Sequence, residues 1–76
     1  MRLTKIEKLI DEAYYQQTRY INRRFGKHSA DYANYGWYSI RKNGGEEIGT
    51  KVYGKGILIT HVSFKSGEIS HHLEEN

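Results

Sequence analysis

The chain of 76 residues contains no cysteine and no proline. Without cysteine it can form neither a disulfide framework nor a thiolate metal site, so we expect a cytoplasmic protein. Long apolar runs are also missing. The longest is Ile57 to Ile59, and the N-terminus lacks the apolar core of a signal peptide. The sequence therefore predicts a soluble protein with no contact to membranes.

The composition is that of one small folded domain spanning residues 1–76. Hydrophobic residues make up 37% of the chain and charged residues 28%, a balance typical of globular rather than disordered proteins. A chain of this length removes only roughly 60–65% of its surface from water on folding. We therefore expect modest stability.

Positive charge is concentrated in the middle of the chain. The formal net charge is +3, but between Arg19 and Lys65 nine Lys or Arg residues stand against three acids. Such a local excess can attract polyanions. A basic surface that only improves solubility is equally compatible with the pattern.

The clearest element is an amphipathic helix over residues 4–25. Thr4 and Glu7 have the spacing of a capping box, and Gly26 suits the left-handed residue that ends a helix. A period of 3.6 residues places seven side chains on a core-facing side: Ile6, Leu9, Ile10, Ala13, Tyr14, Tyr20 and Ile21. The segment 27–36 is harder to assign, and we favour a short helical turn capped by Ser29 and ended by Gly36 over a loop.

Four short strands are predicted after Gly36, over residues 37–42, 46–53, 57–64 and 69–73. Glycine-containing turns separate them, and no repeat or linker intervenes. The expected fold is an α+β, two-layer domain in which the helix packs on one face of a four-stranded antiparallel β-meander.

Matching charged with charged and apolar with apolar residues across the turns predicts a register. A three-residue loop at 43–45, with Gly45 left-handed, places Ile40 opposite Ile48 and Arg41 opposite Glu47. A loop at 54–56 then places Val52 opposite Leu58, and the last hairpin places Phe64 opposite Ile69. The predicted helix-facing side comprises Tyr38, Ile40, Ile48, Thr50, Val52, Leu58, Thr60, Val62, Phe64, Ile69 and Leu73, with His71 at its edge. The opposite side comprises Trp37, Ser39, Arg41, Glu47, Gly49, Lys51, Tyr53, Ile57, Ile59, His61, Ser63 and His72.

The motifs that usually mark an enzyme are missing. The stretch from Gly44 to Lys51 resembles a phosphate-binding loop, but its final residues are in the wrong order and a strand follows it. No nucleophile elbow or acid pair accompanies the serines and histidines. We expect no catalysis and no cofactor. His61 and His72 fall opposite each other in the predicted register, which makes them weak zinc candidates without a third ligand.

Two functions remain. The first is a small basic module that binds nucleic acid, single strands in preference, through an aromatic and basic sheet face and the basic helix end. The second is a small inhibitor or adaptor of the phage or mobile-element type, anti-defence or anti-CRISPR-like, that binds a host nucleic-acid-handling protein such as a nuclease. The predicted binding residues are shared by both functions: Trp37, Arg41, Lys51, Tyr53, Ile57, Ile59, Arg19, Arg23, Arg24 and Lys27. DNA and RNA are not distinguished, and a homodimer through the sheet face is a third use of the same surface.

Overall fold

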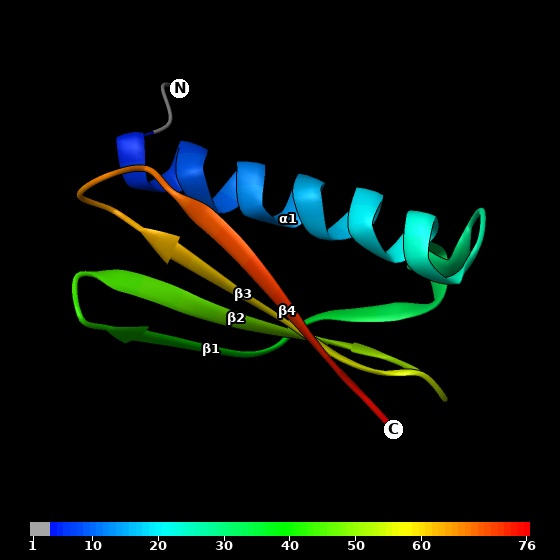
Figure 1. The fold of residues 1–76 in the computed structure, drawn as a ribbon. Coiled ribbons are helices and arrows are strands. Elements are labelled where there is room, and N and C mark those ends of the chain that lie inside the picture. The colour runs from blue at the N-terminus through cyan, green and yellow to red at the C-terminus, as the bar shows by residue number, and fades with distance from the viewer. Residues whose placement is uncertain (1–3) are drawn as a thin grey trace.

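One long helix lies across one face of a four-stranded antiparallel sheet (Figure 1). The computed structural model describes residues 4–76. Its elements are α1 (Lys5–Phe25), the 3-10 helix η1 (Ser29–Tyr32), β1 (Ala33–Lys42), β2 (Gly45–Val52), β3 (Gly56–Ser63) and β4 (Ile69–Glu75). The sheet order β1-β2-β3-β4 follows the sequence. The predicted two-layer α+β meander is confirmed.

The predicted capping box begins α1. The Glu7 backbone N–H donates to Thr4 Oγ1 at 3.1 Å, and the Thr4 N–H donates to Glu7 Oε1 at 2.9 Å. These bonds satisfy two N–H groups that the first turn leaves without a partner. At the other end Gly26 has a φ of 112°, and its N–H donates to the Asn22 carbonyl. None of the helices in residues 4–76 has the length and apolar character that crossing a membrane requires.

The core between α1 and the sheet consists of two apolar clusters. One cluster is built on Ile21 and Leu58, the other on Ile48 and Val62, and all four side chains are fully buried. Three fully buried polar side chains also belong to this interface: Gln17, Thr50 and Thr60. Gln17 lies on the buried stripe of α1 with Ala13 and Ile21, although it was not among the seven residues predicted for the core-facing side.

The predicted register of the first hairpin is wrong. Its loop contains two residues, Asn43 and Gly44, with φ values of 51° and 71°. Positive φ at both central residues defines the type I′ turn, whose twist matches that of the two strands and which favours Asn-Gly. Ile40 therefore lies opposite Glu47 instead of Ile48, and Arg41 lies opposite Glu46 instead of Glu47. Gly45 begins β2 and does not have the predicted left-handed conformation.

The one-residue change in register exchanges the two faces of β1 at its C-terminal end, because neighbouring strand residues point to opposite faces. Tyr38 pairs with Gly49 and Ile40 with Glu47, so both lie on the outer face, which is the face of the sheet turned away from α1. Ser39 pairs with Ile48, so it lies on the helix-facing side. Arg41 lies on that side as well. All four assignments reverse the prediction.

The next two hairpins differ from the prediction by two residues. Val52 lies opposite Gly56 instead of Leu58, and Ile69 lies opposite Val62 instead of Phe64. Gly56 is not part of the turn, because it is held inside the sheet where a Cβ would approach the Glu74 carbonyl oxygen to 2.2 Å. Since a shift of two residues preserves the face, the predicted sides of β2, β3 and β4 are confirmed.

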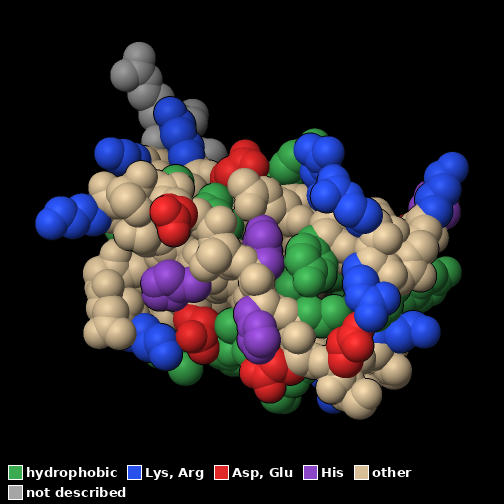
Figure 2. Space-filling view, in the orientation of Figure 1, with side chains coloured by type: hydrophobic (Ala, Val, Ile, Leu, Met, Phe, Trp, Pro, Cys, Tyr) green, Lys and Arg blue, Asp and Glu red, His purple; other side chains and the backbone are tan. Residues whose placement is uncertain are grey.

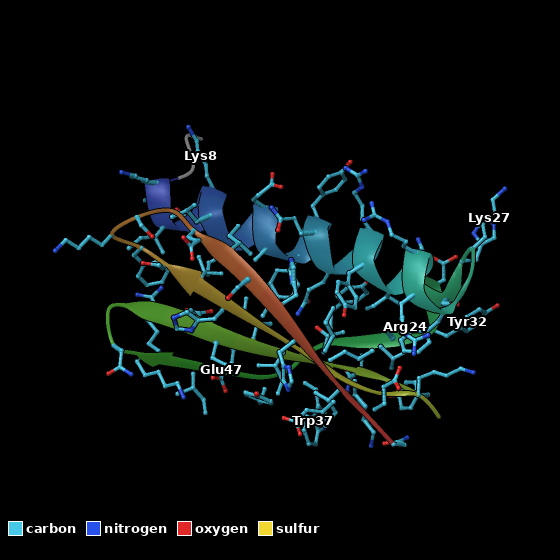
Figure 3. All side chains as sticks on the ribbon, in the orientation of Figure 1. Lys8, Arg24, Lys27, Tyr32, Trp37 and Glu47 are labelled. Carbon is cyan, nitrogen blue, oxygen red and sulfur yellow. The ribbon has the colours of Figure 1, made fainter. Side chains whose placement is uncertain are left out.

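Residues 27–36 form less helix than expected. The 3-10 turn ends at Tyr32, and β1 already begins at Ala33, so the predicted end at Gly36 and the predicted strand start at Trp37 are both wrong. The Asn22 side chain holds this turn against α1 by accepting the Ala30 N–H at 2.8 Å. An irregularity in β1 between Asn34 and Tyr38 keeps Trp37 on the outer face, where Figure 3 shows it pointing away from α1.

Candidate binding surfaces

Apolar and aromatic side chains gather on the outer face of the sheet. We define the outer patch as Trp37, Tyr38, Lys51, Tyr53, Ile57 and Ile59. Lys51 pairs with Ile57 across β2 and β3, and the next row joins Tyr38, Gly49 and Ile59. Trp37 is 50% exposed and Tyr53 60% exposed. The patch therefore contains five of the ten predicted binding residues, together with Tyr38, which we had placed inside.

Tyr38 is fixed by the backbone beneath it. Its ring covers Gly49, where an added Cβ would come within 2.0 Å of a ring carbon. Its hydroxyl donates to Glu47 Oε2 at 2.9 Å. Burial and then the hydrogen bond to the Glu47 carboxylate raise the pKa of Tyr38 to about 12. The Tyr38 ring is thus held in one position at the base of the patch. It contacts the Trp37 ring edge to face, with the ring centroids 5.9 Å apart.

Lys51 lies between the two most exposed aromatic rings of the patch. Its Nζ is 5.6 Å from the centre of the Trp37 ring and 5.9 Å from that of Tyr53. Contacts of this kind, with a cation near an aromatic face, are worth about 0.5–1 kcal/mol at exposed sites. Trp37 and Tyr53 are therefore pre-arranged on either side of one positive charge.

The patch is bordered by charged side chains of both signs. Lys42 Nζ lies 3.2 Å from Glu47 Oε1, and Glu74 of β4 lies opposite Ile57. Among residues 4–76 Lys51 forms no ion pair. Glu47 accepts from both Tyr38 and Lys42, and these hydrogen bonds lower the pKa of its carboxyl group. The outer face therefore has aromatic and aliphatic side chains around the predicted binding residue Lys51, with the Lys42–Glu47 ion pair at its rim.

Arg41 does not join the outer patch. Its Nε donates to Glu46 Oε1 at 2.9 Å, while Ser39 Oγ donates to the other Glu46 oxygen at 2.7 Å. The guanidinium also lies over the Phe64 ring, 5.2 Å from its centre. Arg41 therefore lies on the helix-facing side, and its predicted place on the outer face is wrong.

The four predicted basic residues of the helix end have different environments. Arg24 forms an ion pair with Glu75 and lies over the ring of Phe25. Lys27 is exposed beyond the end of α1 (Figure 3). Arg19 and Arg23 line a groove between α1 and β4 together with Glu12, Tyr15, Gln16, Tyr20 and His71. None of the four lies on the outer face.

A continuous network of polar side chains joins this groove to the core. The sequence predicted only that Thr50 and Thr60 lie on the helix-facing side, with His71 at its edge. Its members are Thr50, Gln17, Thr60, His71, Gln16 and Glu12. Gln17 Oε1 accepts from Thr50 at 2.6 Å, and Gln17 Nε2 donates to Thr60 at 2.9 Å. Thr60 Oγ1 lies 2.7 Å from His71 Nδ1, and His71 Nε2 lies 3.0 Å from Gln16 Oε1.

The donors and acceptors in this network of polar side chains can be assigned from Glu12, which lies at its solvent-exposed end. Glu12 is a carboxylate and only accepts, so the Gln16 amide nitrogen faces it at 3.1 Å and the Gln16 oxygen faces His71. His71 therefore donates from Nε2, and when its Nδ1 accepts from the Thr60 hydroxyl the ring is a neutral imidazole. Burial lowers the pKa of His71, in agreement with this state.

The histidines of the outer face do not form the predicted pair. His61 lies opposite Ser70, and His72 lies opposite Ile59, because the last hairpin is shifted by two residues. Within residues 4–76 no group of three or more His, Asp or Glu side chains is arranged to hold a metal ion. The two histidines are separate members of the sheet surface.

Fold and surface together define a small α+β domain with an apolar outer sheet face and a basic groove beside the helix. No protein-family model matches the chain, and the searches of curated proteins and of solved structures returned no match.

Proposed function

We propose that this chain is a non-enzymatic binding module whose outer patch docks onto a protein partner. The observation that supports this most is the combination of exposed aromatic and aliphatic side chains with a rim at which Lys42 is paired with Glu47. Protein interfaces are depleted of charge at their centres and enriched in Trp, Tyr and Met. A contiguous exposed apolar patch of this kind is uncommon on a surface that serves only solubility.

The proposed anchors are Trp37, Ile57 and Ile59. Ile57 and Ile59 lie on the inner strand β3, which pairs with β2 on one side and β4 on the other, so little backbone freedom remains to be lost there on binding. Trp37 lies on β1, where its ring contacts Tyr38 and Lys51. A matching partner surface is an apolar cleft with an acidic group placed to meet Lys51. A host nuclease or another nucleic-acid-handling protein is the partner class to test first.

Binding of single-stranded nucleic acid is the second candidate, and one specific observation favours it. Lys51 stands between the exposed rings of Trp37 and Tyr53, so two stacked bases would have a positive charge beside the phosphate that joins them. Against it stand the loss of Arg41 from this face and the pairing of Lys42 with Glu47. The protein partner is therefore the better supported of the two.

Capture of partners by the immobilised protein, from lysate with and without nuclease, tests the proposal when it is paired with variants. We expect capture to survive nuclease and to be lost with Trp37→Ala and with Ile57→Ser. Truncating an interface anchor costs about 2 kcal/mol or more, roughly a 30-fold loss of affinity. Tyr15→Ala is the matched control, because it removes an exposed aromatic ring from α1.

Capture that Trp37→Ala and Tyr15→Ala reduce equally would contradict docking through the outer patch. A fluorescence-anisotropy titration with labelled oligonucleotides addresses the second candidate. Saturable binding that weakens with salt, with a slope of roughly −0.7 per phosphate contact, and that requires Trp37 would favour nucleic acid over a protein partner. Sedimentation of the protein alone identifies the case in which the patch pairs with a second copy.

A further inference from the structure

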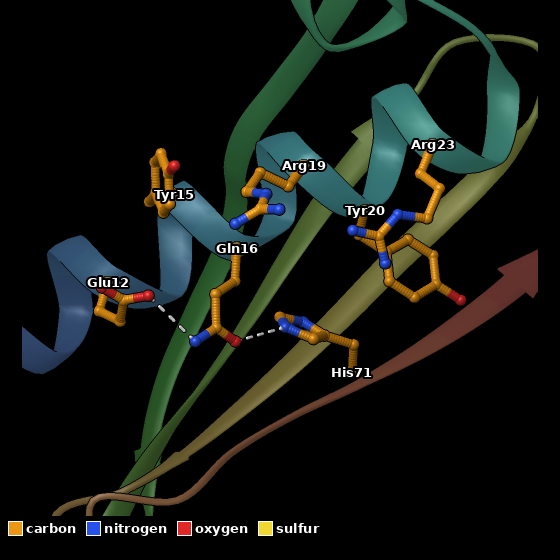
Figure 4. Close-up of a pocket in the computed structure, with 7 residues that line it drawn as sticks. All are labelled: Glu12, Tyr15, Gln16, Arg19, Tyr20, Arg23 and His71. Atoms are coloured by element: carbon orange, nitrogen blue, oxygen red, sulfur yellow. Dashed lines mark hydrogen bonds between the residues drawn. The ribbon is translucent and has the colours of Figure 1, made fainter.

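The groove between α1 and β4 is a second concave surface, separate from the outer patch. It has a volume of about 310 Å³, at the lower end of the range found for small-molecule sites, about 300–1,000 Å³. Figure 4 shows Arg19 and Arg23 extending from the helix over Gln16 and Tyr20, with His71 of β4 on the far side. Figure 2 shows Lys and Arg side chains gathered along this part of the helix.

The guanidinium groups of Arg19 and Arg23 bring positive charge to the groove. They are four residues apart and therefore lie on the same side of α1, one turn from each other. Among residues 4–76 neither forms an ion pair, whereas Arg24 of the same turn is paired with Glu75. Arg19 is held in place by the Tyr15 ring, whose centre lies 5.9 Å from its guanidinium carbon.

The remaining charges of the groove leave its arginine end positive. The acid that lines it, Glu12, is engaged with Gln16 and lies seven residues before Arg19 and eleven before Arg23. At 1.5 Å of rise per residue these separations are about 10 and 16 Å along the helix axis, so Glu12 neutralises neither arginine closely. Burial lowers the pKa of His71, which favours its neutral form, with Nδ1 accepting from Thr60.

Planar rings form the floor of the same end. Tyr20 and His71 pack with their ring centroids 5.7 Å apart, and both side chains are half-buried. Guanidinium groups bind phosphate oxygens in a fork-like geometry that a lysine cannot reproduce. Aromatic rings beside them offer a stacking surface for a base.

We propose that this groove binds the phosphate group of a nucleotide, with Arg19 and Arg23 on the phosphate and the Tyr20 side of the groove against the base. A free mononucleotide and the terminal nucleotide of a strand share this chemistry. The site is on the opposite side of the sheet from the outer patch, so it is independent of the protein-docking function.

Titrations followed by amide and side-chain NMR test the site with three probes: inorganic phosphate, adenosine monophosphate and a 5′-phosphorylated single-stranded oligonucleotide. We expect saturable shifts at residues 12–23 and at His71, with the outer patch unchanged. Adenosine monophosphate should bind more tightly than inorganic phosphate, because only it reaches the rings. A further gain of roughly tenfold or more with the oligonucleotide would identify a strand as the source, and equal affinity would identify the mononucleotide.

Substitution of single arginines separates a built site from general attraction by a basic surface. Arg23→Gln should weaken binding of adenosine monophosphate by roughly tenfold or more, because a charge-assisted contact is lost. Arg24→Gln removes the same charge from the same helix turn and should change it by less than about twofold. Both positions are exposed, so circular dichroism should report an unchanged fold.

Equal weakening by Arg23→Gln and Arg24→Gln would overturn the proposal, since general electrostatics would then account for binding. It would also be overturned if all three probes failed to saturate below about 10 mM at low salt, or if their shifts fell on the outer patch. Neither result would bear on capture of a protein partner through Trp37.

Discussion

Replacement of Gln17 by leucine tests the buried polar layer that joins α1 to the sheet. Gln17 is fully buried, and its amide makes bonds of 2.6 Å with Thr50 and 2.9 Å with Thr60 and a longer one of 3.4 Å with the Ile48 carbonyl. No buried side-chain nitrogen or oxygen among residues 4–76 lacks a partner. Leucine has nearly the same size but offers neither an acceptor nor a donor.

The size of the effect follows from which groups lose their partners. The Thr50 hydroxyl loses its acceptor in a place that water does not reach, which costs about 1–3 kcal/mol. Thr60 loses one bond, worth about 1 kcal/mol, but still donates to His71. The additional apolar surface of leucine offsets part of this. We expect Gln17→Leu to lower the free energy of unfolding by about 2–3 kcal/mol, or roughly 10–20 °C in Tm.

Thermal and urea unfolding measure the change, and Thr50→Val provides the internal control. In the wild type this substitution leaves the buried Gln17 Oε1 without its donor, so it should cost about 1–3 kcal/mol. In the Gln17→Leu background it removes the stranded hydroxyl, so it should restore part of the lost stability. Wild-type melting of Gln17→Leu, or equal cost of Thr50→Val in both backgrounds, would refute the polar layer.

Two further predictions concern the register and the pH dependence of stability. Ile48→Ala should cost about 2–5 kcal/mol because Ile48 is fully buried, whereas Ile40→Ala should change the free energy of unfolding by about 0.5 kcal/mol or less, since Ile40 is 52% exposed on the outer face. Equal costs in chemical denaturation would mean that the first hairpin has the other register. Because burial lowers the pKa of His71, its neutral form stabilises the fold fully above about pH 6.5, and this stability declines as the pH falls from there through the lowered pKa. His71→Asn should flatten the decline of Tm with falling pH in that interval. The control variant His72→Asn, at the exposed neighbouring position, should leave the decline unchanged. The same dependence of Tm on pH in both variants would show that groups other than His71 cause the decline.

The helix and the four strands could be predicted because their signals are local. Thr4 and Glu7 lie within one turn of each other, and the apolar spacing that follows needs no distant partner to define a helical face. Glycine-rich turns separate the strands in the same way. The outer positions of Lys51, Ile57 and Ile59 were predictable as well, since alternation along a strand needs only the correct face.

The composition of the outer face was only partly predictable. The predicted register was chosen so that Ile40 would pair with Ile48 across the strands. The actual register is set by the Asn43-Gly44 turn, because its two left-handed residues match the twist of the strands. The charges found partners in either register, since long side chains reach diagonally, as Lys42 does to Glu47. Pair matching therefore could not decide between the two registers.

The sequence by itself determined a capped amphipathic helix, four antiparallel strands in meander order and the uneven distribution of basic residues. Tertiary structure decided which side chains meet. Gly56 belongs to the sheet because the Glu74 backbone approaches it closely, and Gln17 is buried because Thr50 and Thr60 lie across from it. Each of these contacts joins residues far apart in the chain, so no local pattern encodes it, and a shift of one residue was enough to move Arg41 from the outer patch to the helix-facing side.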